Sequence, residues 1–343
     1  MQGTIASHST PPAGFIESAT ALPSHGIGPR LRRYAWFVLG WNIAVILWGA
    51  VVRATGSGAG CGNHWPLCNG EVVPTSPRIA TLIEFTHRAM TGGATLTVLA
   101  LLIWTIRATR GRHLARFTAV AATVLLLNEA LLGALLVKLG YVVNDQSLGR
   151  FIVLPIHLSN TLLLLAALAL TAHFLARESG FMDGSVEYQL VGLSLIALGT
   201  TIVVGVTGSL AALGDTLFPN ASLAQDFAQS SPWILRLRWM HPAASVFAGI
   251  FVLGIIWLSG SRESGGANRR LANLVLGLLV FQFALGGIDV LLRAPTWMQI
   301  VHLLGADIFW TTLVVLTARI AVVPVGCAGN MCRFSAARAR RVS

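Results

Sequence analysis

Eight apolar stretches, each long enough to cross a lipid bilayer, constrain this 343-residue chain more than any other feature. A membrane-spanning helix needs about 20 predominantly apolar residues. Only 11% of the residues are charged, whereas a typical soluble domain carries about 25%. We therefore expect an all-α membrane protein with eight transmembrane helices. The stretches lie near residues 35–53, 79–106, 115–137, 151–176, 187–210, 236–260, 271–292 and 297–320.

The formal net charge of +11 raises the question of nucleic-acid binding, but the distribution of the charge favours a membrane topology. With the N-terminus inside, 16 of the 24 Lys and Arg residues fall in inner segments and eight in outer loops and helix ends. The positive-inside rule then predicts that both termini are cytoplasmic. Residues 1–29 lack the apolar run of a signal peptide and the repeated arginines of a transit peptide, so we expect a bacterial plasma membrane and no nucleic-acid partner.

An internal repeat divides the eight spans into two sets of four. Residues 51–57 (Val-Val-Arg-Ala-Thr-Gly-Ser) recur as residues 203–209 (Val-Val-Gly-Val-Thr-Gly-Ser), and Glu129 in the third span aligns with Gln282 in the seventh. Because four crossings return the chain to its starting side, the two halves are expected to be parallel four-helix bundles. The expected units are a disordered cytoplasmic tail (1–29), an N-terminal half (30–178), a C-terminal half (179–322) and a basic cytoplasmic tail (323–343).

Four histidines lie near the start of alternate spans, so all four are expected at one depth near the outer face. His87 and His157 belong to the second and fourth spans of the first half, and His241 and His302 to those of the second half. Imidazoles from two such helices can face each other across a buried planar cofactor. Two histidines per site favour haem, since zinc would need more ligands or an open water position. The alternative is hydrogen bonding between helices.

The other five histidines are expected to be solvated or interfacial. His8 and His25 belong to the N-terminal tail, and His113 and His173 lie near the inner ends of spans. His64 lies in the first outer loop, where it is either a proton carrier or simply a polar loop residue.

Three motifs together resemble the haem A synthase family. They are Gly56-Ser57-Gly58-Ala59-Gly60-Cys61, then Trp65-Pro66-Leu67-Cys68-Asn69-Gly70, then Glu84-Phe85-Thr86-His87-Arg88. The resemblance implies that the chain oxidises a ring methyl of haem O to the formyl group of haem A by successive hydroxylation. It also implies that His241 and His302 bind the iron of a resident haem b, while His87 and His157 bind the iron of the haem being modified.

The same resemblance implies partners. Haem O synthase would donate the substrate, the product would serve cytochrome oxidase assembly, and an unidentified donor would supply electrons. Membrane lipid surrounds the expected spans, and a homo-oligomer is left open.

Glu84 is the candidate catalytic residue. It precedes His87 by three residues, which places both side chains on one helix face, whereas Arg238 occupies the matching position before His241. An acid at the substrate edge can accept a proton from attacking water or stabilise positive charge on an oxidised methyl carbon. The alternative is an interfacial carboxylate paired with Arg88 or Arg53.

Arginines near the outer ends of the spans are candidate partners for haem propionates, because guanidinium groups bind carboxylates in a bidentate manner. Ordinary interfacial anchoring is the alternative. The candidates are Arg53, Arg88 and Arg238.

Two pairs of cysteines lie on opposite sides of the expected membrane. Cys61 and Cys68 face the oxidising compartment and can form a disulfide, which would act either as a structural clip or as a redox element. Cys327 and Cys332 lie on the reducing side and are expected to be free thiols. Glu129 is expected to form hydrogen bonds within its bundle, and neither it nor Asp307 is assigned a catalytic role.

A different class of function remains compatible with the same histidines. A di-haem membrane cytochrome b would pass electrons from quinol to an outer acceptor without modifying either haem, and it would have no need of Glu84. A transporter is disfavoured by the parallel repeat and the doubled histidine pairs.

Overall fold

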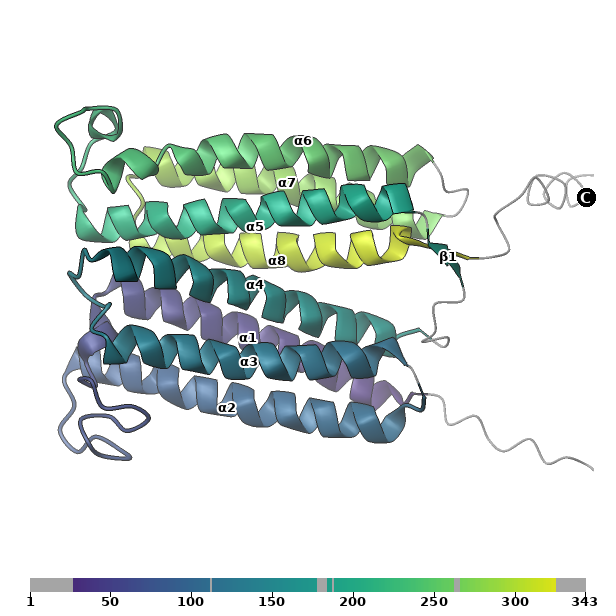
Figure 1. Cartoon of the computed structure of the whole chain (residues 1–343), viewed down its shortest axis with the longest axis horizontal. Coiled ribbons are helices and arrows are strands. Elements are labelled where there is room, and N and C mark those ends of the chain that lie inside the picture. The colour runs from purple at the N-terminus through teal and green to yellow at the C-terminus, as the bar shows by residue number, and fades with distance from the viewer. Residues whose placement is uncertain (1–26, 112, 178–183, 187, 262–265, 325–343) are drawn as a thin grey trace, which may run out of the picture.

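The computed structural model of the chain describes residues 27–111, 113–177, 184–186, 188–261 and 266–324. This part of the chain contains eight long helices that run along one common direction and are joined at the two ends of the molecule (Figure 1). All eight are long and apolar enough to span a membrane, so the predicted all-helical, multi-pass architecture is confirmed. The helices are α1 (Pro29–Ala54), α2 (Ile79–Ala108), α3 (Leu114–Lys138), α4 (Leu148–Leu175), α5 (Tyr188–Leu217), α6 (Met240–Ser261), α7 (Gly266–Leu291) and α8 (Thr296–Ile320).

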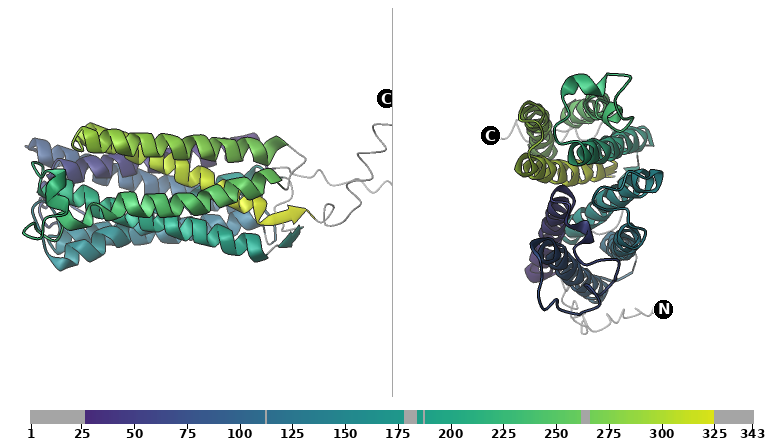
Figure 2. Two further views of the ribbon diagram at one scale, coloured as in Figure 1. Left: turned by 90° about the horizontal axis from the view of Figure 1, so that it is seen from above. Right: turned by 90° about the vertical axis from the view of Figure 1, so that its left-hand side faces the viewer.

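The helices form two groups of four, α1–α4 and α5–α8. In each group every helix packs against the next one in sequence, and the first helix also packs against the fourth. The second and fourth helices therefore stand diagonally across each group, as the end-on view in Figure 2 shows. The groups meet where α1 and α4 pack against α8, and α4 also packs against α5.

The apolar core of the first group extends into the second. Trp310 and Val314 of α8 belong to the same buried cluster as Leu165 and Leu168 of α4. The indole Nε1 of Trp310 donates a hydrogen bond to the carbonyl of Leu162 at 2.7 Å. α8 therefore completes the core of the first group, whereas the second group has its own buried cluster, which includes Val252, Val275 and Leu313.

Large apolar side chains cover the outward surfaces of the remaining helices. Leu96, Phe117, Trp257 and Val280 are between 62% and 75% exposed. Monomeric soluble proteins rarely expose such continuous apolar surface. Lipid contact is the environment that this surface fits.

The helix boundaries differ from the predicted ones mainly at the end of α5 and at the starts of α1, α6 and α7. α5 continues to Leu217 because its last turn is polar but satisfied: the hydroxyl of Thr216 donates to the carbonyl of Ala212 at 2.8 Å. α6 begins at Met240, after the short 3-10 helices η2 (Leu223–Asp226) and η3 (Leu235–Leu237).

A two-stranded ribbon at one end of the molecule falls outside the all-helical expectation. β1 (Gly184–Val186) pairs antiparallel with β2 (Val322–Pro324), with Ser185 opposite Val323. This pairing joins the segment between the two helix groups to the segment after α8. We call this end of the molecule the ribbon end and the opposite end the loop end (Figure 1).

Two histidines predicted to be solvated or interfacial are buried instead. The Nδ1 of His113 accepts a hydrogen bond from the backbone N–H of Ala115 at 3.1 Å and so caps α3. Burial, reinforced by Arg116, lowers the pKa of the His113 imidazole, which keeps the ring in the neutral form that can accept this bond. His173 is buried within α4.

The predictions for both tails lie outside the described residues, apart from a few positions next to α1 and α8. The same holds for His8, His25, Cys327 and Cys332.

Candidate functional site

The four histidines singled out in the sequence all lie near the loop end. The even-numbered helices begin at that end, and each histidine falls within the first three turns of its helix. His87 and His157 stand on the diagonal helices α2 and α4, and His241 and His302 on the diagonal helices α6 and α8.

The two imidazoles of the second group lie next to each other across the bundle. The ring centroids of His241 and His302 are 6.2 Å apart and their planes are nearly perpendicular, at 89°. The Nδ1 of His241 lies 3.1 Å from the carbonyl oxygen of Val204, and a bond there leaves Nε2 as the free ring nitrogen. The Nδ1 of His302 is buried and has no hydrogen-bond partner among the described residues.

Each imidazole faces a glycine on a neighbouring odd-numbered helix. A methyl group at three of these glycines would press on the ring, and at the fourth it would make ordinary contact. The distances from an ideal Cβ to the ring Cε1 are 3.1 Å for Gly49 and His87, 3.9 Å for Gly133 and His157, 3.0 Å for Gly208 and His241, and 3.3 Å for Gly286 and His302. The missing side chains let the rings lie close against the helix backbones.

A carboxylate accompanies one histidine of the first group. The Oε1 of Glu129 on α3 lies 3.2 Å from the Nδ1 of His157. Its Oε2 accepts a hydrogen bond from the Nδ2 of Asn160 at 2.5 Å, and the Thr161 hydroxyl also donates to Oε1. The hydrogen-bonding role predicted for Glu129 is therefore present, but the sequence did not indicate that His157 is beside it.

The donor set fits a haem iron better than other metals. Within the described residues, no group of three or more His, Cys, Asp or Glu side chains gathers as a metal site. Metal–imidazole bonds are about 2 Å long, so rings whose centroids are 6.2 Å apart leave room for one metal ion between them. The buried Nδ1 atoms of His87, His157 and His302 have no hydrogen-bond partner among the described residues. The ligand role of all four histidines stays a prediction.

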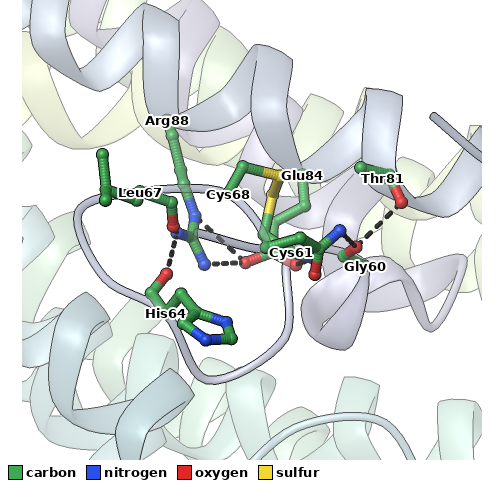
Figure 3. A network of polar contacts seen from close by, with 9 residues as sticks. Gly60, Cys61, His64, Leu67, Cys68, Thr81, Glu84 and Arg88 are labelled. Atoms are coloured by element: carbon green, nitrogen blue, oxygen red, sulfur yellow. Dashed lines mark hydrogen bonds and ion pairs between the residues drawn. A yellow bond between two sulfur atoms is a disulfide. The ribbon is translucent and has the colours of Figure 1, made fainter. Parts of the chain in front are cut away.

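Glu84 is buried and held by three contacts, shown in Figure 3. Its Oε1 accepts hydrogen bonds from the Nε of Arg88 at 3.1 Å and from its Nη2 at 2.5 Å. Its Oε2 accepts a bond from the backbone N–H of Cys61 at 2.8 Å. The pairing with Arg88 is the alternative that the sequence left open, and it fixes the carboxylate beside the helix turn that carries His87.

The predicted disulfide between Cys61 and Cys68 is present, and both cysteines are buried. Its loop lies directly on the start of α2. A Cβ on Gly60 would come within 2.4 Å of the carbonyl oxygen of Ala80, so only glycine allows this approach. The hydroxyl of Thr81 donates to the carbonyl of Gly60 at 2.8 Å (Figure 3).

Arg88 fastens the same loop from the other side. Its Nη1 donates to the backbone carbonyls of His64 and Leu67, each at 2.6 Å. The guanidinium is thus shared between Glu84 and the disulfide loop. The side chain of His64 is exposed, as expected of a polar loop residue.

Arg53 connects the two helix groups. Its Nη1 donates to the carbonyl of Ala212 at 2.6 Å and to the hydroxyl of Thr216 at 2.5 Å, and its Nη2 donates to the Oε1 of Gln299 at 2.7 Å. These partners belong to α5 and α8, and Gln299 precedes His302 by three residues. The sequence did not indicate this cross-group role.

Arg238 is likewise engaged by the protein. Its Nε lies 3.2 Å from Asp215 and its Nη1 lies 3.4 Å from Asp226. Burial raises the pKa of the Asp226 carboxyl, and the positive charge of Arg238 opposes that shift. The expectation that Arg53, Arg88 and Arg238 bind haem propionates therefore stays a prediction, since all three guanidinium groups already have protein partners.

Comparison with known proteins gives matches along most of the chain. The model of the COX15-CtaA family, described as cytochrome oxidase assembly protein, matches residues 32–314. A Thermus thermophilus protein named protoheme IX farnesyltransferase is 45% identical over 293 residues, which is 84% of this chain but 48% of that protein. A heme A synthase of Halalkalibacterium halodurans is 38% identical over 287 residues, covering 79% and 90% of the two chains. A heme A synthase of an Exiguobacterium species is 28% identical over 278 residues, covering 80% and 87%. The chain thus spans about half the length of the Thermus relative.

Proposed function

Because this chain belongs to the haem A synthase family of cytochrome oxidase assembly proteins, we propose that it oxidises haem O to haem A. The reaction converts a ring methyl into a formyl group by successive hydroxylation. Matches along most of the length of relatives named heme A synthase support this proposal. The observation that carries it is the pair of diagonal imidazoles in each helix group, with the His241 and His302 rings 6.2 Å apart.

The two groups take different haems. His87 and His157 bind the iron of the haem O substrate, and His241 and His302 bind a resident haem b. The support is chemical: Glu84, Glu129 and the disulfide loop surround the first pair, whereas Arg238 and Gln282 occupy the matching positions around the second. When bound, the resident haem supplies one-electron redox chemistry.

Glu84 acts at the edge of the substrate. Its carboxylate accepts a proton from the attacking water or stabilises positive charge at the oxidised methyl carbon. Arg88 and the N–H of Cys61 hold both of its oxygens, so the group is oriented before the substrate arrives. The disulfide loop covers this position and limits the access of bulk water.

The substrate is handed over by the enzyme that farnesylates haem. The support is the Thermus relative, which carries the name protoheme IX farnesyltransferase and is about twice as long as the region it shares with this chain. The protein resides in a bacterial plasma membrane with the loop end towards the outer side, and an electron donor and the cytochrome oxidase assembly pathway are its further partners.

Pigment analysis tests the proposal directly. The full chain is co-expressed with a haem O synthase, and the extracted haems are identified by mass spectrometry. We expect haem A or hydroxylated haem O with the native chain, loss of both with His157→Ala, and loss of haem b with His302→Ala. A native chain that holds two unmodified haems and yields neither product would instead be a di-haem electron carrier.

A further inference from the structure

Glu129 and Gln282 occupy matching places in the two helix groups. Each lies four residues, or about one helical turn, before a glycine that faces a histidine. Gly133 faces His157 and Gly286 faces His302. In each group, this position lies beside the histidine of the fourth helix. It is occupied by a carboxylate in the first group and by an amide in the second.

The contacts of these two side chains differ. Glu129 reaches the His157 ring, with 3.2 Å between Oε1 and Nδ1. The Nε2 of Gln282 instead donates to the backbone carbonyl of His302 at 3.1 Å, and its Oε1 has no hydrogen-bond partner in the described part of the chain. Within the described residues, His157 is the one histidine of the four with a carboxylate oxygen within 4.0 Å of a ring nitrogen.

Neighbouring residues explain why the two side chains take different positions. Asn160, three residues after His157, donates to Oε2 of Glu129 and fixes the carboxylate. The matching position in α8 is Gly305, where a Cβ would come within 2.7 Å of the Oε1 of Gln282. The first group therefore orients a negative charge at the histidine, and the second leaves space for a neutral side chain.

We propose that Glu129 is a positioning residue that accepts a hydrogen bond from the Nδ1–H of His157 and lowers the midpoint potential of the iron bound in the first group. The two atoms lie 3.2 Å apart, and the buried Nδ1 has no hydrogen-bond partner among the described residues, so its N–H can be donated to Oε1. The proposed bond requires the ring to turn so that its N–H points at Oε1. This inference rests on the proposed function, because it requires a haem on His157.

The physical reason is the charge of the ligand. A carboxylate behind a metal-binding imidazole fixes its tautomer and raises its basicity. A more basic ligand favours ferric over ferrous iron, since the ferric ion carries one more positive charge. The iron in the first group is therefore easier to oxidise to the ferric state than the iron in the second.

Redox titration of the purified full chain, loaded with haem in the membrane, tests this assignment. The two optical waves are assigned with the His302→Ala variant, which lacks the second site. Glu129→Gln keeps the shape of the side chain but removes its charge. We expect it to raise the potential of the first site alone, by about 59 mV for each tenfold loss in ferric-over-ferrous preference. Haem retention at that site falls by about 10- to 100-fold.

Two further variants distinguish an effect of Glu129 on the midpoint potential from an effect on packing. Glu129→Asp retains the charge and is expected to restore part of the low potential. Thr161→Val removes the hydroxyl that also bonds Glu129 but leaves the carboxylate in place. We expect it to lower the thermal stability of the haem-free protein without raising the potential. Equal potentials for native protein and Glu129→Gln, with only stability changed, would reduce Glu129 to a packing residue and overturn the proposal.

The reciprocal variant covers the case in which Glu129→Gln does not fold. Gln282→Glu places a carboxylate beside His302, and we expect the potential of the second site to fall while the first is unchanged. An unchanged second site would contradict the inference. Failure of the proposed function is distinguishable, because it appears as absent haem A with both potentials still measurable.

Discussion

The two helix groups share a scaffold but differ in the residues that surround it. Both place histidines on diagonal helices and seat each ring against a glycine. Around this common frame, the first group adds the buried Glu84, the disulfide loop and Glu129. The second carries Arg238, paired with Asp215 and Asp226, and the neutral Gln282. The common frame fits the proposed binding of one iron in each group, and the different charges fit the proposed difference between the two haems.

The largest effect is expected from Glu84, which precedes His87 in the first group and is matched by Arg238 before His241 in the second. Glu84→Gln should leave both haems bound but reduce haem A formation by about 10²- to 10⁴-fold, the usual contribution of a positioned proton acceptor. Haem content and product are measured in the same preparation. Glu71→Gln, an exposed carboxylate in the same loop, is the control. Normal haem A output from Glu84→Gln would remove this residue from the mechanism.

The next effect concerns the contact between the groups. Arg53→Met removes three hydrogen bonds from a charged donor, each worth about 1.5–3 kcal/mol. We expect a clear drop in the thermal midpoint of the haem-free protein, whereas Arg236→Met at an exposed position should have little effect. Unchanged stability together with loss of haem would instead assign Arg53 to a propionate.

Replacement of both Cys61 and Cys68 by serine should have a smaller effect on stability. Loss of a native disulfide typically costs about 2–4 kcal/mol, and this one is buried against the start of α2. We expect less protein in the membrane and haem A in proportion to the protein that remains. A stable protein that works slowly would show that the pair transfers electrons or thiols, which would sharpen the difference between the groups.

The smallest effects should come from the glycines that both groups share. Gly49→Ala and Gly208→Ala each press a methyl group on a histidine ring, at 3.1 and 3.0 Å, and overpacking costs about 1–3 kcal/mol. We expect weaker haem retention in the first group for one and in the second group for the other. Gly40→Ala and Gly199→Ala on the same helices meet nothing within 4 Å and serve as controls. Loss of the same haem in both variants would break the assignment of one site to each group.

Much of the fold could be predicted because it depends on local pattern. The lengths of the apolar runs fixed eight helices to within a few residues at most ends. α5 extends beyond its predicted end because the polar side chains of its last turn have partners. Asp215 is paired with Arg238, and the hydroxyl of Thr216 donates to the carbonyl of Ala212. The β1–β2 ribbon could not be predicted because two strands of three residues each are too short to show a periodic pattern in the sequence.

The candidate site was predicted only in part. The histidines, the disulfide and the acid before His87 were visible as spacings in the sequence. The partners of Arg53 and of Glu129 were not, because hydrogen bonds between helices depend on tertiary packing and leave no period in the chain. Two exchanges within the repeat, Glu84 for Arg238 and Glu129 for Gln282, were the sequence signals that pointed to a difference between the groups.

The side chain of Trp310 in the second helix group forms part of the core of the first group. Its ring fills the interior of the neighbouring bundle and bonds the carbonyl of Leu162. Residues 30–178 produced as a separate fragment would lose this ring from their apolar core, together with its hydrogen bond to Leu162. We therefore expect such a fragment to be less stable in a bilayer than the intact chain.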